Sequence, residues 1–416
     1  MIRKRYFESL LTDAEIHARL AQGLNHASLA GQRVLVIVPD GTRTAPLPQL
    51  LHHLQALLSD QVRALDVLIA LGTHPPMSEA AIRHHLGVEP GEVRVFNHRW
   101  GSPDTLVTVG TLTEDDLRRY SQGRLAQAVP ITVNKRIFDY DHLIVCGPVF
   151  PHEVVGFSGG TKYFVPGISG QEIIDVTHWL GALITSRAVI GRRDTPVRRL
   201  IDRAVQFIDL PVTYCNLVVS HEGLHGLFIG SYPEAWRDAA ALSARLHVRT
   251  VNRRFRRVLS VMPEMYDDIW TAAKGMYKVE PVVADGGEVI IYAPHIDELS
   301  YTHGEILDEI GYHVRDYFVK QWARFKPYPW GVLAHSTHLR GTGTYNAETG
   351  EERPRIRVTL ATGIPRERCE RVNLDYRDPA TIDPAEWAHR EGEGLLLVPH
   401  AGEQLYRLAD AEKERA

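Results

Sequence analysis

Short aliphatic runs alternate with helical leucine patterns through the first 250 residues. RVLVIV (33–38) and LDVLIAL (65–71) are bounded and apolar, as is typical of strands buried on both faces of a sheet. Between them, leucines at 47, 50, 51, 54, 57 and 58 repeat at helical spacing. EVRVFNH (92–98) and HLIVCGP (142–148) predict further strands. This rhythm needs crossover connections, and it therefore predicts an α/β fold with a mostly parallel sheet.

A basic, polar segment, RTVNRRFRRVLSV (249–261), leads into a second series. A helix is expected over 266–284, and strands are expected at VLSVMP, EVIIYAP, GVLAHS, RIRVTLAT and GLLLVPH. We therefore predict an N-terminal α/β domain over 1–250 and a C-terminal α/β domain over 251–400. A terminal helix over 401–416 is expected to pack on the first domain. The cleft between the two domains is the expected active site.

Charge and cysteine content narrow the class of partner. The 47 Lys and Arg nearly balance the 51 Asp and Glu, which argues against nucleic-acid binding and favours a small ligand. Cys146, Cys215 and Cys369 are scattered, so neither a disulfide framework nor a thiolate zinc site is expected. The start, MIRKRYFESLL, has no apolar signal core, and no run approaches the length of a membrane span. A cytoplasmic protein without a membrane partner is expected.

Two polar loops follow predicted strands. Asp40 and Arg43 lie in DGTRTAP; the arginine suits forked recognition of a carboxylate or phosphate, and Asp40 could orient it. An internal salt bridge in a turn explains the pair equally well. His74 in GTHPPM sits at the next strand end, where an imidazole either closes the turn or does chemistry.

The segment GPVFPHEVVGFSGGTKYFVPGISGQEIIDVTHWLG (147–181) is the most informative. His152 follows a stiff, proline-flanked entry, and Gly159 and Gly160 allow a bulky group to approach the main chain. Lys162 lies between this glycine turn and an apolar stretch. It is either a solvated surface charge or a partly desolvated nucleophile or attachment point.

A capping box, Ser169 to Glu172, predicts a helix starting near 170, with His178 on the face of Ile174 and Asp175. His178 is either a core histidine or a lone metal ligand, to which something other than protein must add donors. Trp270, Thr271 and Lys274 share one side of another predicted helix. The chain has 21 His, so chance pairs such as HSTHLR (335–340) are discounted as metal sites.

Together, DGTR, GTHPPM, PHEVVGFSGGTKYFVPGISG, THWLGAL and WTAAKGM resemble the lactate racemase family, in this order and over nearly the whole chain. The resemblance implies a nickel-pincer nucleotide, bonded covalently to Lys162 and ligated through nickel by His178. It implies that His74 and His152 are the acid/base pair of a 2-hydroxy acid racemase or epimerase that works by reversible hydride transfer. Asp40, Thr42, Gly159 and Gly160 would line the cofactor, and Arg43 and Lys274 would hold anionic groups of substrate or cofactor. Cofactor-synthesis proteins are implied partners.

The sequence departs from the family at the substrate side. Thr271 stands where lactate racemase has a glutamine, and Trp270 where a tyrosine is expected. A shorter hydroxyl spans less distance, so we expect an acid other than lactate: larger, differently charged, or a sugar acid. Two other classes stay open. One is a hydrolase or lyase using both histidines around a simple divalent metal, and the other is a non-catalytic carrier of the cofactor.

Overall fold

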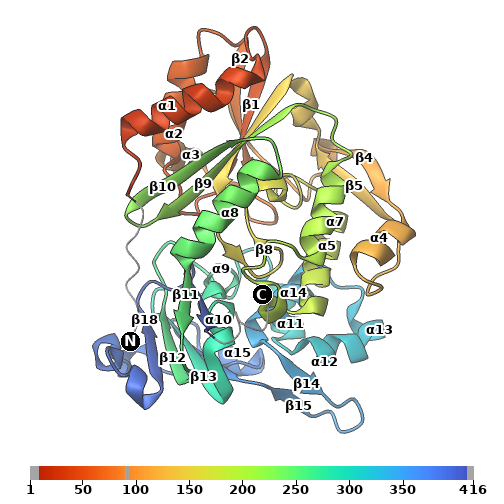
Figure 1. The fold of residues 1–416 in the computed structure, drawn as a ribbon. Coiled ribbons are helices and arrows are strands. Elements are labelled where there is room, and N and C mark those ends of the chain that lie inside the picture. The colour runs from red at the N-terminus through yellow and green to blue at the C-terminus, as the bar shows by residue number, and fades with distance from the viewer. Residues whose placement is uncertain (1–8, 90, 92, 410–416) are drawn as a thin grey trace.

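The computed structural model describes residues 9–409 apart from residues 90 and 92. Two main sheets dominate it, one of six strands from the first part of the chain and one of five strands from the second (Figure 1). Nearly all neighbouring strands in both sheets run parallel. The predicted α/β class with mostly parallel sheets is therefore confirmed.

The first sheet has the order β10-β9-β6-β1-β2-β3, and only the edge strand β10 is antiparallel. Alternate residues of its strands face two different cores: Val34 and Val36 pack toward α1 and α2, whereas Leu35 and Ile37 pack toward α5 and α7. Helices thus cover both faces. The elements are α1 (Asp13–Leu24), β1 (Arg33–Pro39), α2 (Leu47–Leu58), β2 (Ala64–Ala70), α3 (Glu79–Leu86), β3 (Val95–Asn97), β6 (His142–Pro148), α5 (Gln171–Ile184), α7 (Pro196–Val205), β9 (Val212–Ser220), β10 (Gly223–Gly230) and α8 (Glu234–His247).

The second sheet has the order β17-β16-β13-β12-β18. Its core takes in Trp179 from α5, which stacks on Trp322 at 5.2 Å between ring centroids. Helix α5 therefore packs into both halves. The elements are β12 (Phe255–Val261), α9 (Ile269–Ala272), α10 (Lys274–Tyr277), β13 (Val283–Ala293), α11 (Gly304–Ile310), α12 (Arg315–Lys320), α13 (Trp322–Phe325), α14 (Trp330–Arg340), β16 (Arg357–Thr362), α15 (Arg366–Arg371), β17 (Asp375–Tyr376) and β18 (Leu395–Val398).

Short strand pairs and helices complete the chain. The strand pairs are β4 (Leu106–Leu112) with β5 (Val129–Asn134), β7 (Pro151–His152) with β8 (Gly156–Phe157), β14 (Gly343–Tyr345) with β15 (Glu352–Pro354), and β11 (Val248–Val251) with β19 (Leu405–Leu408). The short helices are α4 (Glu114–Tyr120) and α6 (Ser186–Val189). The switch between the two main sheets falls near residue 250, but the division into independent domains stays a prediction.

Three sequence-based expectations were wrong in detail. In place of the terminal helix over 401–416, residues 405–408 form β19, because this segment satisfies its backbone by pairing with β11; residues 410–416 lie outside the described part. GVLAHS lies in helix α14, whose residues 332–339 are all buried, and periodicity cannot separate such a helix from a buried strand. The helix expected over 266–284 is broken into α9 and α10, and β13 begins at Val283.

The strand order places the functional loops together. Along the chain, β1, β2 and β3 extend the sheet to one side and β6 then pairs with β1 on the other, so the order reverses between β1 and β6. Ligands of open α/β sheets bind beyond the carboxyl ends of strands at such a switch point. The loops after β1 and β2 carry Asp40 and His74, and the short strand β7 after β6 carries His152. Over the described residues, no helix is long and apolar enough to cross a membrane.

Candidate active site

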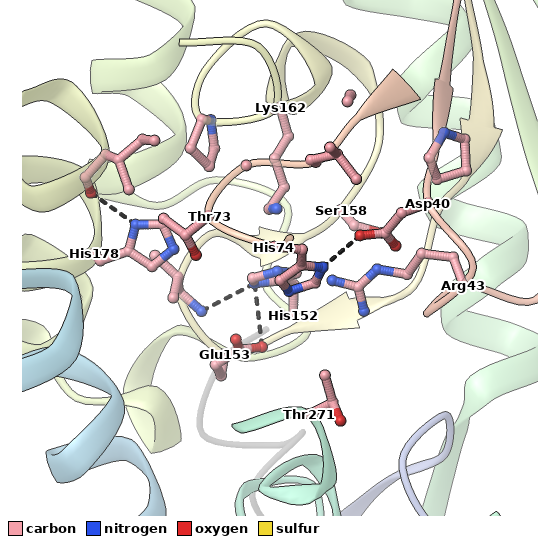
Figure 2. A pocket seen from close by; sticks show the side chains of 18 of the residues that line it. Asp40, Arg43, Thr73, His74, His152, Glu153, Ser158, Lys162, His178 and Thr271 are labelled. Carbon is pink, nitrogen blue, oxygen red and sulfur yellow. Dashed lines mark hydrogen bonds and ion pairs between the residues drawn. The ribbon is translucent and has the colours of Figure 1, made fainter. Parts of the chain in front are cut away.

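A cavity of about 1080 Å³, counting its open mouth, lies at the carboxyl ends of β1, β2 and β6. We call it the central pocket. Loops of the first half meet α9, α10 and α14 of the second half there, and all the predicted site residues line it except Thr42 and Gly160 (Figure 2).

His74 is held by a buried carboxylate. Its Nδ1 bonds to Oδ2 of Asp40, whose Oδ1 accepts from the backbone N–H of Thr42 at 3.1 Å and from its hydroxyl at 2.7 Å. Burial opposes the charge of Asp40, but His74 and Thr42 hold the pKa of this carboxyl below its ordinary value. An ionised Asp40 accepts a hydrogen bond from Nδ1–H. In this tautomer Nε2 of His74 carries the lone pair and is the basic nitrogen. Asp40 thus orients His74 through a hydrogen bond, whereas the sequence analysis expected it to orient Arg43.

His152 also has a carboxylate beside Nδ1. It lies on β7 with 5% of its surface exposed, and Oε2 of Glu153 is 3.2 Å from its Nδ1. The backbone N–H of Val154 donates to this same nitrogen at 3.2 Å, so Nδ1 is an acceptor in this arrangement. Burial and the nearby Lys162 hold the pKa of His152 well below its ordinary value, so the ring is neutral at rest. Glu153 is placed to stabilise the imidazolium whenever His152 takes a proton.

Lys162 stands on a tight turn. Gly159 and Gly160 adopt φ of 77° and 60°, the left-handed region that favours glycine, and a Cβ on Gly159 would lie 2.6 Å from Val149. Figure 2 shows the Lys162 amine directed into the central pocket. Burial and the neighbouring Arg43 lower the pKa of this amine to about 7. A large fraction is therefore the neutral, nucleophilic form near neutral pH.

A buried arginine stabilises that turn through hydrogen bonds to its backbone. Arg198 on α7 is 2% exposed and donates to the carbonyls of Phe157 and Gly159 at 2.5 and 3.3 Å, and to the Thr161 hydroxyl at 2.9 Å. Its guanidinium also lies 4.4 Å from the ring centroid of Trp236. These contacts fix the backbone that carries Lys162. Nothing in the sequence pattern distinguishes Arg198 from its exposed neighbours.

His178 presents one free nitrogen to the pocket. Its Nδ1 donates to the carbonyl of Ile174 at 2.7 Å, which leaves Nε2 as the acceptor. Burial lowers the pKa of His178 to about 4, so the ring is neutral and able to bind a metal. Asp175, expected on the same face, accepts from the backbone N–H of Gly331 at 2.7 Å. The helix N-cap is Gly170, without a side-chain cap, so the capping box was also wrong.

Cations gather on one side of the pocket. Arg43 and Lys274 line it, and Lys278 joins them in a smaller adjoining cavity. The Lys274 amine is buried without a hydrogen-bond partner, 4.2 Å from the ring centroid of Tyr266. Burial and the nearby Arg43 hold the pKa of Lys274 well below its ordinary value. An unpartnered amine beside a guanidinium is the chemistry of an anion site.

Trp270 and Thr271 border the pocket from α9. Trp270 stacks on His335 at 4.1 Å between centroids and contacts His303 at 4.6 Å. The Thr271 hydroxyl donates to Asp268, at 2.8 Å to its carboxylate. Its hydrogen is therefore committed to the helix cap and is not offered to a ligand.

Thr42 and Gly160 occupy positions outside the central pocket. Thr42 lines two neighbouring cavities and acts on the site through Asp40. A Cβ on Gly160 would lie 3.0 Å from both Tyr232 and Trp236, so this glycine is needed for close packing behind the turn. Gly159 lines the pocket, whereas Gly160 does not.

Several lining residues escaped the sequence reasoning. His335 and His338, discounted as a chance pair, are buried on α14 and line the central pocket. The Nε2 of His338 has no partner, and the nearby charge of Glu153 faces it. The signal was available: the pair lies in an apolar run, and reading that run as a helix would have brought both rings to adjoining faces.

The described residues fit a metal that brings most of its own donors. No group of three or more His, Cys, Asp or Glu among them is arranged to hold an ion. His178 would be a lone protein ligand, with its free Nε2 in the same pocket as a lysine of lowered pKa and an unpartnered Lys274 amine. Such a set suits an anionic, metal-bearing organic cofactor better than a bare cation.

Comparison with known proteins agrees with this fold. The Lactate racemase N-terminal domain family matches residues 13–191. A Lactate racemase of Thermoanaerobacterium thermosaccharolyticum is 25% identical over 275 residues, covering 64% of this chain and 61% of the relative. A second, from Lactiplantibacillus plantarum, is 28% identical over 149 residues, or 35% of this chain and 32% of the relative. The alignments thus span less than two thirds of these relatives.

Solved structures match over more of the chain. A crystal structure of a Thermotoga maritima protein has a TM-score of 0.90 at 35% identity, over 97% of this chain and all of the other. The structure of the lactate racemase apoprotein from Thermoanaerobacterium thermosaccharolyticum has a TM-score of 0.70 at 18% identity, covering 97% of this chain and 95% of that one. The second likeness establishes the shared fold.

Proposed function

This chain belongs to the lactate racemase family, and on that premise we propose that it is a racemase or epimerase of a 2-hydroxy acid. One observation carries the proposal. Two imidazoles, His74 and His152, line one pocket, and each has a carboxylate beside Nδ1. Inversion at a hydroxylated carbon needs a base for each configuration, and this pair supplies both.

Proton transfer is the work of the two histidines. For a substrate of one configuration, Nε2 of His74 accepts the hydroxyl proton and Asp40 stabilises the imidazolium. For the other configuration, His152 takes this part in the tautomer whose Nδ1–H faces Glu153 instead of accepting from Val154. Net inversion needs the opposite histidine to be protonated when the alcohol re-forms. That imidazolium gives its proton to the new hydroxyl while the first histidine keeps the proton it accepted, and proton exchange with solvent then restores the starting states. The planar keto acid turns between the two events, enclosed by the pocket walls.

The carboxylate of the substrate is assigned to the cationic side of the pocket. The Arg43 guanidinium can bind it through two parallel bonds, and the unpartnered Lys274 amine can donate a further hydrogen bond. Holding the carboxylate there fixes the α-carbon near both imidazoles. A phosphate of a nucleotide cofactor would compete for the same charges, and the adjoining Lys278 extends the anion site for it.

We assign a nickel-pincer nucleotide as the cofactor. Lys162 would attach it covalently, Nε2 of His178 would ligate the nickel, and Asp40 and Gly159 would lie beside it. When bound, this group supplies a reversible acceptor for the α-hydrogen of the substrate. The fit rests on the lowered pKa of Lys162 and on the free Nε2 of His178. Proteins that synthesise the cofactor are the implied partners.

The test is the intact mass of the chain produced together with the cofactor-making enzymes. We expect a nucleotide-sized increment in the wild type and in a Lys135→Ala control, an exposed lysine, but none in Lys162→Ala. The loaded protein should interconvert the two forms of a chiral 2-hydroxy acid. An increment retained in Lys162→Ala would refute the attachment site. Full activity in a host without the cofactor, abolished by chelators, would instead support a hydrolase or lyase using a simple divalent metal.

A further inference from the structure

We propose that a second cavity beside the central pocket binds a long, uncharged, hydroxyl-bearing tail, so that the substrate class is the aldonic acids. This inference rests on the proposed function and assigns its substrate. The cavity, here called the tail chamber, has a volume of about 1010 Å³ counting its mouth. Its walls come from the loop after β2, from α3, and from the segments 265–271 and 300–303.

The tail chamber is continuous with the reacting centre. Asp40, Thr73, His74, Trp270 and Thr271 line both cavities. A substrate whose carboxylate lies on Arg43 and whose hydroxyl lies on His74 therefore extends its remaining carbons past Thr271 into the chamber. The methyl group of lactate would leave nearly all of this space to water, whereas a chain of four further carbons would use it.

Charge in the tail chamber differs from charge in the central pocket. Among the described residues that line the chamber there is no lysine or arginine, whereas Asp40, Asp267 and Asp268 contribute carboxylates. The cations Arg43 and Lys274 lie on the side of the central pocket. A second carboxylate on the substrate would face like charge without a partner, so dicarboxylic acids are disfavoured.

The residues that line the tail chamber carry several hydrogen-bonding groups, and one of them has no partner. Nε2 of His303 has no partner although the residue is only 7% exposed. An orphaned buried nitrogen costs free energy unless a ligand or water satisfies it. Hydroxyls of Thr73, Ser78 and Thr302 line the same space, and carboxylates such as Asp267 accept from hydroxyl donors. This mixture of acceptors and hydroxyls matches a polyol and leaves no partner for a second anion.

The first experiment compares three acids on the cofactor-loaded protein. D-gluconate has a neutral hydroxylated tail, lactate has none, and malate carries a second carboxylate. We expect kcat/KM for 2-epimerisation of D-gluconate to exceed the value for either other acid by at least about tenfold, since the site's polar groups are satisfied only by the first. Ala81→Phe, which fills the tail chamber from α3, should remove most of that preference. Ala80→Phe, exposed on the same helix and outside the chamber, is the matched control.

Reversing the charge of the tail chamber provides a gain-of-function test. Asp267→Lys should raise kcat/KM for malate relative to D-gluconate by at least about tenfold. Glu348→Lys, an exposed acid in a distant loop, should leave the ratio unchanged. Preference for lactate or malate in the wild type, or an equal effect of Ala81→Phe on all three acids, would overturn the proposal.

Calorimetric titration of the purified protein separates this proposal from the proposed function. We expect D-gluconate to bind at least about tenfold more tightly than malate, and Asp267→Lys to narrow the difference. A protein that inverts none of the acids but keeps this binding preference would refute the racemase assignment and retain the tail chamber. A protein that inverts lactate while binding D-gluconate no better than malate would support the racemase assignment and refute the tail chamber.

Discussion

Asp40 and His74 leave adjacent parallel strands, and their side chains join in one hydrogen bond between Oδ2 and Nδ1. We expect Asp40→Asn to lower kcat for either configuration by about 100-fold or more. The amide keeps the shape but removes the charge that stabilises the His74 imidazolium, and it can favour the wrong tautomer. Steady-state rates in both directions provide the measurement.

The matched control for that variant is Thr42→Val. It removes a hydrogen bond to Asp40 while leaving the carboxylate charge, so a loss of tenfold or less is expected. Equal losses in Asp40→Asn and Thr42→Val would show that Asp40 only shapes the loop.

Removing either imidazole should stop net inversion but leave one half of the reaction. We expect His74→Ala and His152→Ala to lower kcat at least about 1000-fold in both directions, because a full cycle needs both. In single turnovers, with cofactor-loaded protein in an amount equal to the substrate, each variant should still form keto acid from one configuration of the substrate. The configuration that His74→Ala still oxidises should be the opposite of the one that His152→Ala oxidises. Chemical trapping of the keto acid measures this. The same retained configuration in both variants would contradict the assignment.

Reactivity of Lys162 should respond to pH in the neutral range. Its pKa is about 7 in the folded protein, against 10.5 for an ordinary lysine, so the amine is protonated below about pH 7 and neutral above it. The rate at which an amine-directed reagent modifies Lys162 in the cofactor-free protein should therefore rise through pH 7 and level off near pH 8. Peptide mass mapping after timed exposure gives the profile, with Lys135 as an internal reference. A rate that keeps rising to pH 10 at Lys162 would show that the amine is not desolvated.

Stability of the lysine turn should depend on Arg198. Arg198→Met removes donors to Gly159, Phe157 and Thr161, and we expect a loss of about 2–4 kcal/mol in the free energy of unfolding. Arg199→Met, on the same helix as Arg198, breaks only an exposed pair with Asp194 just before that helix, and it should cost less than about 1 kcal/mol. Denaturant unfolding measures both variants. Similar losses of unfolding free energy in the two variants would mean that the Arg198 hydrogen bonds do not stabilise the turn.

Sequence reasoning found β1, β2, β3 and β6 of the first sheet because these strands are bounded, apolar runs separated by helical patterns, but it did not predict β9 and β10. The α3 caps, Ser78 and Gly87, were also predictable, since both lie within one helical turn of the apolar pattern. Helix α14 was missed because it is buried on nearly every face, which erases the polar half of the helical period. The terminal strand β19 was missed because its partner, β11, lies more than 150 residues away.

Some residues of the candidate site could likewise be predicted from the sequence and others could not. His74, His152, Lys162 and His178 could be predicted because they lie in loops or at spacings that a single segment displays. The groups that set their chemistry come from elsewhere in the chain: Arg198 reaches the lysine turn from α7, and His338 comes from α14. Only the folded arrangement shows that Asp40 serves His74 through its carboxylate.

The pairing of β19 with β11 also has a consequence for anion binding. The turn before β19 brings Glu403 to the hydroxyl of Thr44 at 2.6 Å, and its carbonyl accepts from the Lys278 amine at 3.1 Å. One wall of the anion site therefore comes from a segment more than 100 residues away from Lys278 along the chain. Loss of the β11–β19 pairing would open this wall to solvent, so anion binding depends on a strand pair that belongs to neither main sheet.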